Sequence, residues 1–254
     1  MALILNIETS CATCSVALSY DGMILHHLED FEGRNHAAML SDMIKSCMDY
    51  LETHDGMKLD AVAVSIGPGS YTGLRIGLSE AKGIAYGLKI PLIGVPTLEL
   101  LATMAMFEIA DFNPDTDLFA PMIDARRMEV FTGVYDASLQ PLMGPSPEIL
   151  DDSVYSRWLA PGRRLLYMGD GAKKAREVLR SVSAVYVPDI IPLATGMTPL
   201  SEKLMRDKKY LDLAYSVPQY LKEFQATAPR KKLKGKRKYA QFFLTLQKIT
   251  AKSR

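Results

Sequence analysis

The chain has 254 residues, enough for one large domain or two small ones with a buried core. Hydrophobic residues make up 48% and charged residues 23%, and no apolar run approaches the roughly 18 residues of a membrane-spanning helix. Composition thus indicates a globular protein and argues against a membrane-spanning one. Three cysteines, an odd number, and an N-terminus without a basic region are typical of the reducing cytosol, so we expect a cytoplasmic protein.

The net charge of +1 hides an asymmetry between the body and the C-terminus. Residues 230–254 hold ten Lys/Arg and no Asp/Glu, which leaves 20 Lys/Arg against 29 Asp/Glu in the rest, a net of −9. We expect this extension either to be a solvated segment or to contact RNA phosphates. The candidate RNA contacts are its densest basic run: Arg230, Lys231, Lys232, Lys234, Lys236, Arg237 and Lys238.

The N-terminal segment predicts three strands. Apolar residues fill 3–7, alternation marks 15–19, and the Asp21-Gly22 pair predicts a hairpin turn into a strand over 23–30. Between the first two strands lie an acidic-hydroxyl loop, Glu8 to Ser10, and a Cys-x-x-Cys motif, Cys11 to Cys14. Only Cys47 remains as a further cysteine, so the pair is interpreted as two small residues in a tight loop, not as a zinc site.

A helix is predicted from about Asn35 to Thr53. His36, Leu40, Ile44, Cys47 and Leu51 share one stripe, which methionines widen. This stripe fits either an ordinary core face or a surface that repacks against a partner. Leu40 stands four residues after His36, so a His-x3-His metal pair is absent.

The central feature of the sequence is a strand, glycine turn and helix. Residues 61–66 read as a buried strand, Gly67-Pro68-Gly69 ends it, and Ser70 or Thr72 can cap a helix reaching about Leu88. Each interior glycine of that helix costs about 1 kcal/mol against alanine. Gly73, Gly77, Ala81 and Ala85 form a smooth stripe, which predicts either tight packing on the chain's own sheet or docking of another subunit's helix.

Exposed N–H groups at such a glycine turn suggest phosphate binding, but the turn does not match the known phosphate-binding or nucleophile motifs. Thr72 stands where a dinucleotide-binding fingerprint needs its third glycine, and no lysine follows it as a P-loop requires. Ser70 directly follows Gly69, which does not fit a hydrolase nucleophile elbow. The loop can still face a ligand.

Alternating strands and helices continue and indicate an α/β protein. A strand over 91–95 leads into a helix opened by Pro96, and Asn113 to Asp115 suggests a domain boundary. The second half predicts strands over 119–123 and 130–135, flanking Asp124 and Arg126, which either line a cleft or form a turn salt bridge. A second strand–glycine–helix unit follows at 165–182, and a last helix is predicted over 200–208. Two halves that each open with strands and a hairpin suggest a duplication.

These segments carry a family resemblance. Residues 65–77, 81–85 and 93–101, the Asp124-Ala125-Arg126 segment and the closing segment 210–224 closely resemble the TsaB (YeaZ) family, from Leu3 to about Thr227. The closing segment has Lys222 where that family usually has arginine, and the basic extension lies outside the family pattern. The resemblance implies an α/β, actin/hexokinase/Hsp70-like (ASKHA) fold of two similar subdomains, with mixed sheets flanked by helices. We expect subdomains at 1–106 and 107–229 and an extension at 230–254.

The resemblance also implies a function. TsaB proteins are non-catalytic scaffolds for TsaD, which transfers threonylcarbamoyl to the tRNA adenine next to the anticodon. The ATPase TsaE joins the complex. When TsaD is absent, TsaB forms a homodimer. No metal is implied, and no cofactor beyond weak or interfacial ATP or ADP. The residues expected to bind the partner are His36, Met39, Leu40, Met43, Ile44, Cys47, Gly73, Gly77, Ala81 and Ala85.

A vestigial nucleotide cleft is the second implied site. In the superfamily, the loop after the first strand faces a nucleotide phosphate, and its acidic residue is usually Asp, here Glu8. The candidate residues are Glu8, Thr9, Ser10, Gly67, Gly69, Ser70, Thr72, Asp124 and Arg126. The alternatives are a glycoprotease-like metallopeptidase or nucleotide-hydrolysing enzyme of the same superfamily, and an ATP-gated regulatory domain. The missing His-x3-His pair counts against the peptidase.

Overall fold

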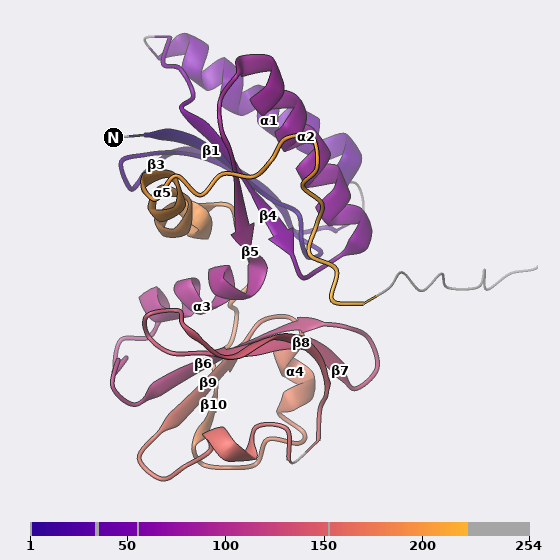
Figure 1. Cartoon of the computed structure of the whole chain (residues 1–254), viewed down its shortest axis with the longest axis vertical. Coiled ribbons are helices and arrows are strands. Elements are labelled where there is room, and N and C mark those ends of the chain that lie inside the picture. Colours follow the sequence, from indigo (N-terminus) through magenta and orange to yellow (C-terminus); the bar gives the residue numbers. More distant parts are fainter. Residues whose placement is uncertain (1, 34–35, 55, 152, 223–254) are drawn as a thin grey trace, which may run out of the picture. The chain divides into compact units, whose positions relative to one another are not determined.

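The computed structural model describes residues 2–33, 36–54, 56–151 and 153–222 (Figure 1). Its first sheet has the strand order β3-β2-β1-β4-β5. The strands are β1 (Leu3–Glu8), β2 (Cys14–Tyr20), β3 (Met23–Asp30), β4 (Ala61–Gly67) and β5 (Leu92–Pro96). β1 to β3 pair antiparallel, while β4 pairs parallel with both β1 and β5. The continuous apolar run of β4 suits a parallel strand covered on both faces.

The second sheet repeats this order as β8-β7-β6-β9-β10. Its strands are β6 (Asp117–Asp124), β7 (Glu129–Tyr135), β8 (Pro141–Ile149), β9 (Arg164–Met168) and β10 (Ala184–Tyr186). Pairing is antiparallel from β6 to β8, and β9 lies parallel to β6 and β10. The duplicated α/β architecture predicted from the sequence is therefore confirmed, with β6 equivalent to β1 and β9 equivalent to β4.

Helices cover both sheets. They are α1 (His36–Thr53), α2 (Tyr71–Leu88), α3 (Thr97–Glu108), α4 (Ala172–Ala175) and α5 (Thr198–Arg206), with short 3₁₀ turns at Ser156–Trp158 and Thr195–Met197. Residues of α1 and α2 share one core cluster with β1, β2 and β4. α5 packs on the opposite face of that sheet, and α3 contributes to clusters on both sheets. None of these described helices is long and apolar enough to cross a membrane.

The ends of α2 follow from its sequence. Ser70 is the N-cap, and its hydroxyl oxygen accepts the Gly73 N–H at 3.2 Å, as one of the two sequence alternatives predicted. Lys89 ends the helix in the left-handed conformation, and its N–H bonds to the carbonyl oxygen of Tyr86. The Asn35 cap predicted for α1 lies outside the described residues. α4 is much shorter than the predicted helix over 172–182.

The C-terminal part of the described chain returns to the first sheet. Leu200 of α5 packs with Ile4 and Ile93, and Leu211 packs against the cluster of α1 and α2. The Leu211 N–H also bonds to the carbonyl oxygen of Leu92 at 2.8 Å. α5 and the segment around Leu211 therefore pack on the first sheet although they follow the second sheet in sequence, whereas Ile190 still packs against the second sheet. The expected subdomain bounds stay a prediction.

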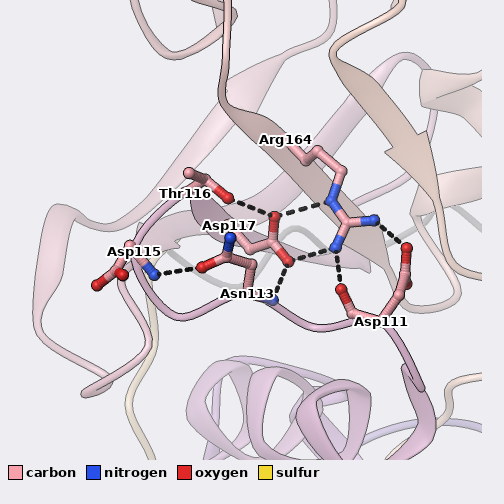
Figure 2. A network of polar contacts seen from close by, with 6 residues as sticks. All are labelled: Asp111, Asn113, Asp115, Thr116, Asp117 and Arg164. Carbon is pink, nitrogen blue, oxygen red and sulfur yellow. Dashed lines mark hydrogen bonds and ion pairs between the residues drawn. The ribbon is translucent and has the colours of Figure 1, made fainter.

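An arginine-centred network fixes the connection from α3 to β6 (Figure 2). Arg164 at the start of β9 donates to both carboxylate oxygens of Asp117, at 2.8 and 2.6 Å, and pairs with Asp111 at 2.7 Å. Asp117 also accepts the Asn113 N–H at 2.8 Å, and its side chain is fully buried. Burial alone would raise the pKa of Asp117, but the hydrogen bonds from Arg164, Asn113 and Thr116 together with the charge of Arg164 lower that pKa. The network is structural and lies away from the predicted site residues.

Candidate functional site

The predicted cleft residues follow the carboxyl ends of equivalent strands. Glu8 ends β1 and Asp124 ends β6, while Gly67 to Gly69 follow β4 and Gly169 to Gly171 follow β9. Ligands of α/β proteins commonly bind at this edge. Cys11, three residues beyond Glu8, packs in one core cluster with Ile123 at the end of β6 and Met168 at the end of β9. The fold thus brings the two loop regions together, as the family resemblance implies.

Glu8 is fully buried and incompletely satisfied. Its Oε1 accepts the Ser10 N–H at 2.5 Å, whereas Oε2 has no hydrogen-bond partner among the described residues. Desolvation raises its pKa, against the opposing effect of hydrogen bonds from Ser10. Burial therefore disfavours the ionised form of this carboxyl group.

The glycine loop is closed by the chain itself. A methyl group added at Gly69 would overlap the Ser10 carbonyl oxygen, and one at Gly73 would overlap that of Thr9. The Ser70 N–H donates to the Ser10 carbonyl oxygen at 2.6 Å, and the Thr9 hydroxyl donates to the Gly73 carbonyl oxygen at 2.9 Å. The Ser70 N–H is thus already engaged by Ser10, and Thr9 and Ser10 fill the space beside Gly73 and Gly69.

This contact corrects the ligand-facing role predicted for several residues. Thr9 and Ser10 are fully buried against α2, and Gly67 is buried beside the Gln219 carbonyl oxygen. Thr72 is exposed on the first turn of α2, and Ser70 serves as its cap. The close approach of the backbone at Thr9 and Ser10 accounts for the glycines at 69 and 73.

Asp124 organises the turn between β6 and β7. Its Oδ1 accepts the Arg126 N–H at 2.5 Å and pairs with Lys174 of α4 at 2.8 Å. The Asp124 N–H in turn donates to Asp170 at 2.8 Å, and α4 has no side-chain cap. The Arg126 side chain is exposed, and its backbone has a positive φ of 71°. Asp124 thus forms an ion pair with Lys174, which neither sequence interpretation named.

Most of the partner-binding residues predicted on α1 lie inside the fold. Leu40 and Cys47 are fully buried, and Met43 and Ile44 are 4% and 7% exposed. They pack against the first sheet, which corrects their assignment to a partner surface: this stripe is the core face. Met39 is 39% exposed and remains available. The His36 side chain lies outside the described residues.

The small-residue stripe of α2 is also internal. Gly73, Gly77, Ala81 and Ala85 are all buried. A methyl group at Gly77 would overlap the Thr9 hydroxyl, and both alanines belong to the core cluster of α1 and the sheet. The predicted helix-docking role of these four residues is therefore corrected, and tight packing within the chain explains them.

A different face of α2 points outward. Its exposed residues include Thr72, Ser79, Gly83, Tyr86 and Gly87. Tyr86 is 78% exposed, and a methyl group at Gly83 or Gly87 would meet nothing within 4 Å. These two glycines therefore cost helix stability without serving the packing of the described chain. The sequence holds a signal for this orientation of α2, because Leu74 and Leu78 adjoin the Gly73 stripe and mark that side of the helix as the core face.

The outward face of α2 is bordered on both sides. Towards α1, the Ser41 hydroxyl donates to Glu80 at 3.2 Å, so the outer surfaces of the two helices are continuous. On the other side runs the closing segment, residues 209–222. Lys82 donates to the Ser216 carbonyl oxygen at 2.7 Å, and Arg75 donates to the Tyr220 hydroxyl at 2.8 Å. Sequence reasoning missed these residues because it did not pair α2 with the closing segment.

Side chains arranged for metal binding are absent from the described part of the chain: no three His, Cys, Asp or Glu residues there could share an ion. Cys11, Cys14 and Cys47 are free and buried. Burial raises the pKa of the Cys14 and Cys47 thiols to about 12, so neither is a ready nucleophile. The candidate RNA contacts at 230–238 lie outside the described residues.

Comparison with known proteins gives consistent matches. The family model for TsaD, tRNA N6-adenosine threonylcarbamoyltransferase, matches residues 30–232. The tRNA threonylcarbamoyladenosine biosynthesis protein TsaB of Escherichia coli (strain K12) is 31% identical, covering 92% of this chain and 99% of that protein. The TsaB protein of Bacillus subtilis (strain 168) is 28% identical over 89% of this chain and 96% of its own length. The crystal structure of YeaZ from Pseudomonas aeruginosa is 25% identical and has a TM-score of 0.73, covering 87% of this chain and all of that one.

Proposed function

Because this chain belongs to the TsaB (YeaZ) family of tRNA threonylcarbamoyladenosine biosynthesis proteins, we propose that it is an accessory subunit that binds a TsaD-type transferase. Two features support a non-catalytic role. Thr9 and Ser10 fill the space beside the glycine loop, and the pKa of the buried acid next to them, Glu8, is raised. Neither supplies a nucleophile–base pair or an open metal site of the kind that catalysis of group transfer requires.

The docking surface for TsaD is the outer face of α1 and α2. The observation that carries this assignment is the pair of exposed glycines, Gly83 and Gly87, whose open surroundings let a partner helix approach the backbone. Tyr86 stands between them as a large exposed anchor, and Met39 adds an adaptable side chain on α1. In the absence of TsaD, the same face pairs with a second copy of this chain.

The remaining parts of the role follow the family. TsaE, the ATPase of the pathway, joins the assembly, and the chain works in the cytoplasm beside its tRNA. It needs no resident metal or cofactor; any ATP or ADP is weakly held or bound at a subunit interface. The basic run Arg230–Lys238 contributes phosphate contacts to the tRNA.

The docking proposal is tested by mixing this chain with the TsaD of the same organism and measuring mass by size-exclusion light scattering. Gly83→Arg places a long cation on the outer face of α2 without displacing any described atom. We expect it to abolish the heterodimer while the chain stays folded by circular dichroism. Gly144→Arg is the matched control, because Gly144 is exposed on β8 and also has nothing within 4 Å.

A Gly83→Arg heterodimer as stable as the wild-type one would overturn the docking surface. A wild-type chain that does not bind TsaD at all would overturn the accessory role itself. For the extension, deleting residues 230–254 should weaken retention of tRNA by the complex at low salt. Unchanged retention would make the extension a solvated appendage.

A further inference from the structure

The end of the closing segment ties together two loops of the site. The Gln219 N–H donates to the Ile66 carbonyl oxygen at 2.7 Å, just before the glycine turn. The Tyr220 hydroxyl accepts from Arg75 of α2, and Lys222 forms an ion pair with Glu129 at the start of β7. Residues 219–222 therefore connect the first turns of α2 with the β6–β7 hairpin.

Arg75 is held by two aromatic rings. Its guanidinium carbon lies 4.2 Å from the Tyr71 ring centroid and 5.7 Å from that of Tyr220, and the two rings are 4.8 Å apart. The side chain is exposed, and no carboxylate of the described residues forms an ion pair with it. The result is a positioned cation without an ion-pair partner in the described part of the chain, beside the partly exposed ring of Tyr220.

Further basic residues lie in the hairpin turn that the segment 219–222 reaches, and in the sequence that follows it. Arg126 and Arg127 are exposed in the hairpin turn that precedes Glu129, the partner of Lys222. Eight residues after Lys222, the sequence enters the run with seven Lys/Arg in nine positions. The rest of the chain carries an excess of acids, so this concentration is specific to one region.

We propose that Tyr71, Arg75 and Tyr220 form an RNA contact in which Arg75 binds a backbone phosphate and Tyr220 stacks on an unpaired base. An acidic protein partner would need only the cation. Single-stranded RNA uses both a cation and an exposed ring, and a basic chain follows directly in sequence. The identity of the RNA as a tRNA rests on the proposed function, whereas the contact chemistry rests on this cluster alone.

The test is fluorescence anisotropy of a labelled, unmodified tRNA transcript with the full chain at several salt concentrations. Arg75→Met should weaken binding about fivefold and lower the slope of log K against log salt by about 0.7 to 0.9, the loss of one phosphate contact. Tyr220→Leu should weaken binding by about five- to 150-fold, as expected for a lost stacking contact, with an unchanged salt slope. Tyr220→Phe keeps the ring and should retain most of the affinity. Arg180→Met removes another exposed arginine and should have no effect.

The salt slope separates this contact from a simple loosening of the closing segment, because loosening would affect the Arg75→Met and Tyr220→Leu variants alike. Wild-type affinity and slope in both variants would overturn the proposal. So would an Arg75→Met variant that keeps tRNA affinity and loses TsaD binding, since the cluster would then be a protein contact. The Gly83→Arg experiment contains no RNA, so failure of the accessory role and failure of the RNA contact are distinguishable.

Discussion

The two kinds of glycine in α2 should respond oppositely to the same substitution. Gly77→Ala gains about 1 kcal/mol of helix propensity. Its methyl group, however, overlaps the Thr9 hydroxyl and lies 3.3 Å from Thr9 Cβ and Cγ2, and Thr9 is fully buried. Overpacking costs about 1–3 kcal/mol. Disturbing the 2.9 Å hydrogen bond from Thr9 to Gly73 costs about 1 kcal/mol more. We expect a net loss of about 1–3 kcal/mol.

Gly83→Ala meets no atom within 4 Å and should raise the free energy of unfolding by about 0.5–1 kcal/mol. Urea denaturation followed by circular dichroism measures both variants, at a concentration where light scattering shows a monomer. The expected difference between the variants is about 2–4 kcal/mol, and each kcal/mol corresponds to roughly 2–4 °C in Tm for a chain of this size. Equal effects of the same sign would refute the assignment of an inner and an outer face to α2.

Three further predictions concern buried charge and the closing segment. Arg164→Met should lower the free energy of unfolding at pH 7 by about 2–3 kcal/mol, because Asp117 is left buried without its cation. Since the wild-type pKa of Asp117 is lowered, the stability that its ion pair contributes is lost as pH falls. Urea denaturation near pH 3.5 should therefore show a smaller difference between the variant and the wild type. Glu8→Gln should gain stability relative to wild type as pH rises above 4.5, because the raised pKa of Glu8 makes folding oppose its ionisation; a pH-independent difference between the two would contradict this. Lys82→Met should speed chymotrypsin cleavage at Tyr215, since two carbonyl contacts to the closing segment are lost; unchanged cleavage would mean that Lys82 does not anchor the segment.

Local patterns were sufficient to predict the repeated topology. Strand alternation, the Asp21-Gly22 hairpin and the Gly67-Pro68-Gly69 turn each determine structure within a few residues. The edge strand β8 was missed because Pro141, Pro145 and Pro147 obscure a strand pattern. Prolines are tolerated there because an edge strand leaves one row of N–H groups unpaired.

The site was harder to predict because it depends on which elements meet. The sequence shows that Gly73 and Gly77 leave room for another backbone segment to approach the helix. It does not show that this segment is the one around Thr9 of the same chain. The sequence likewise did not determine which face of α1 is buried, since Met43 suits either a core or a partner surface. The Arg75–Tyr220 contact joins residues 145 positions apart, so only the fold reveals it.

The most direct test of the account is hydroxyl-radical footprinting of this chain with and without TsaD. Tyr86 and Met39 are exposed, reactive side chains on the outer face of α2 and α1, and Phe107 of α3 is a control that is 75% exposed. The account predicts that TsaD lowers oxidation of Tyr86 and Met39 severalfold and leaves Phe107 unchanged. A stable complex in which Tyr86 and Met39 react as in the free chain would contradict it.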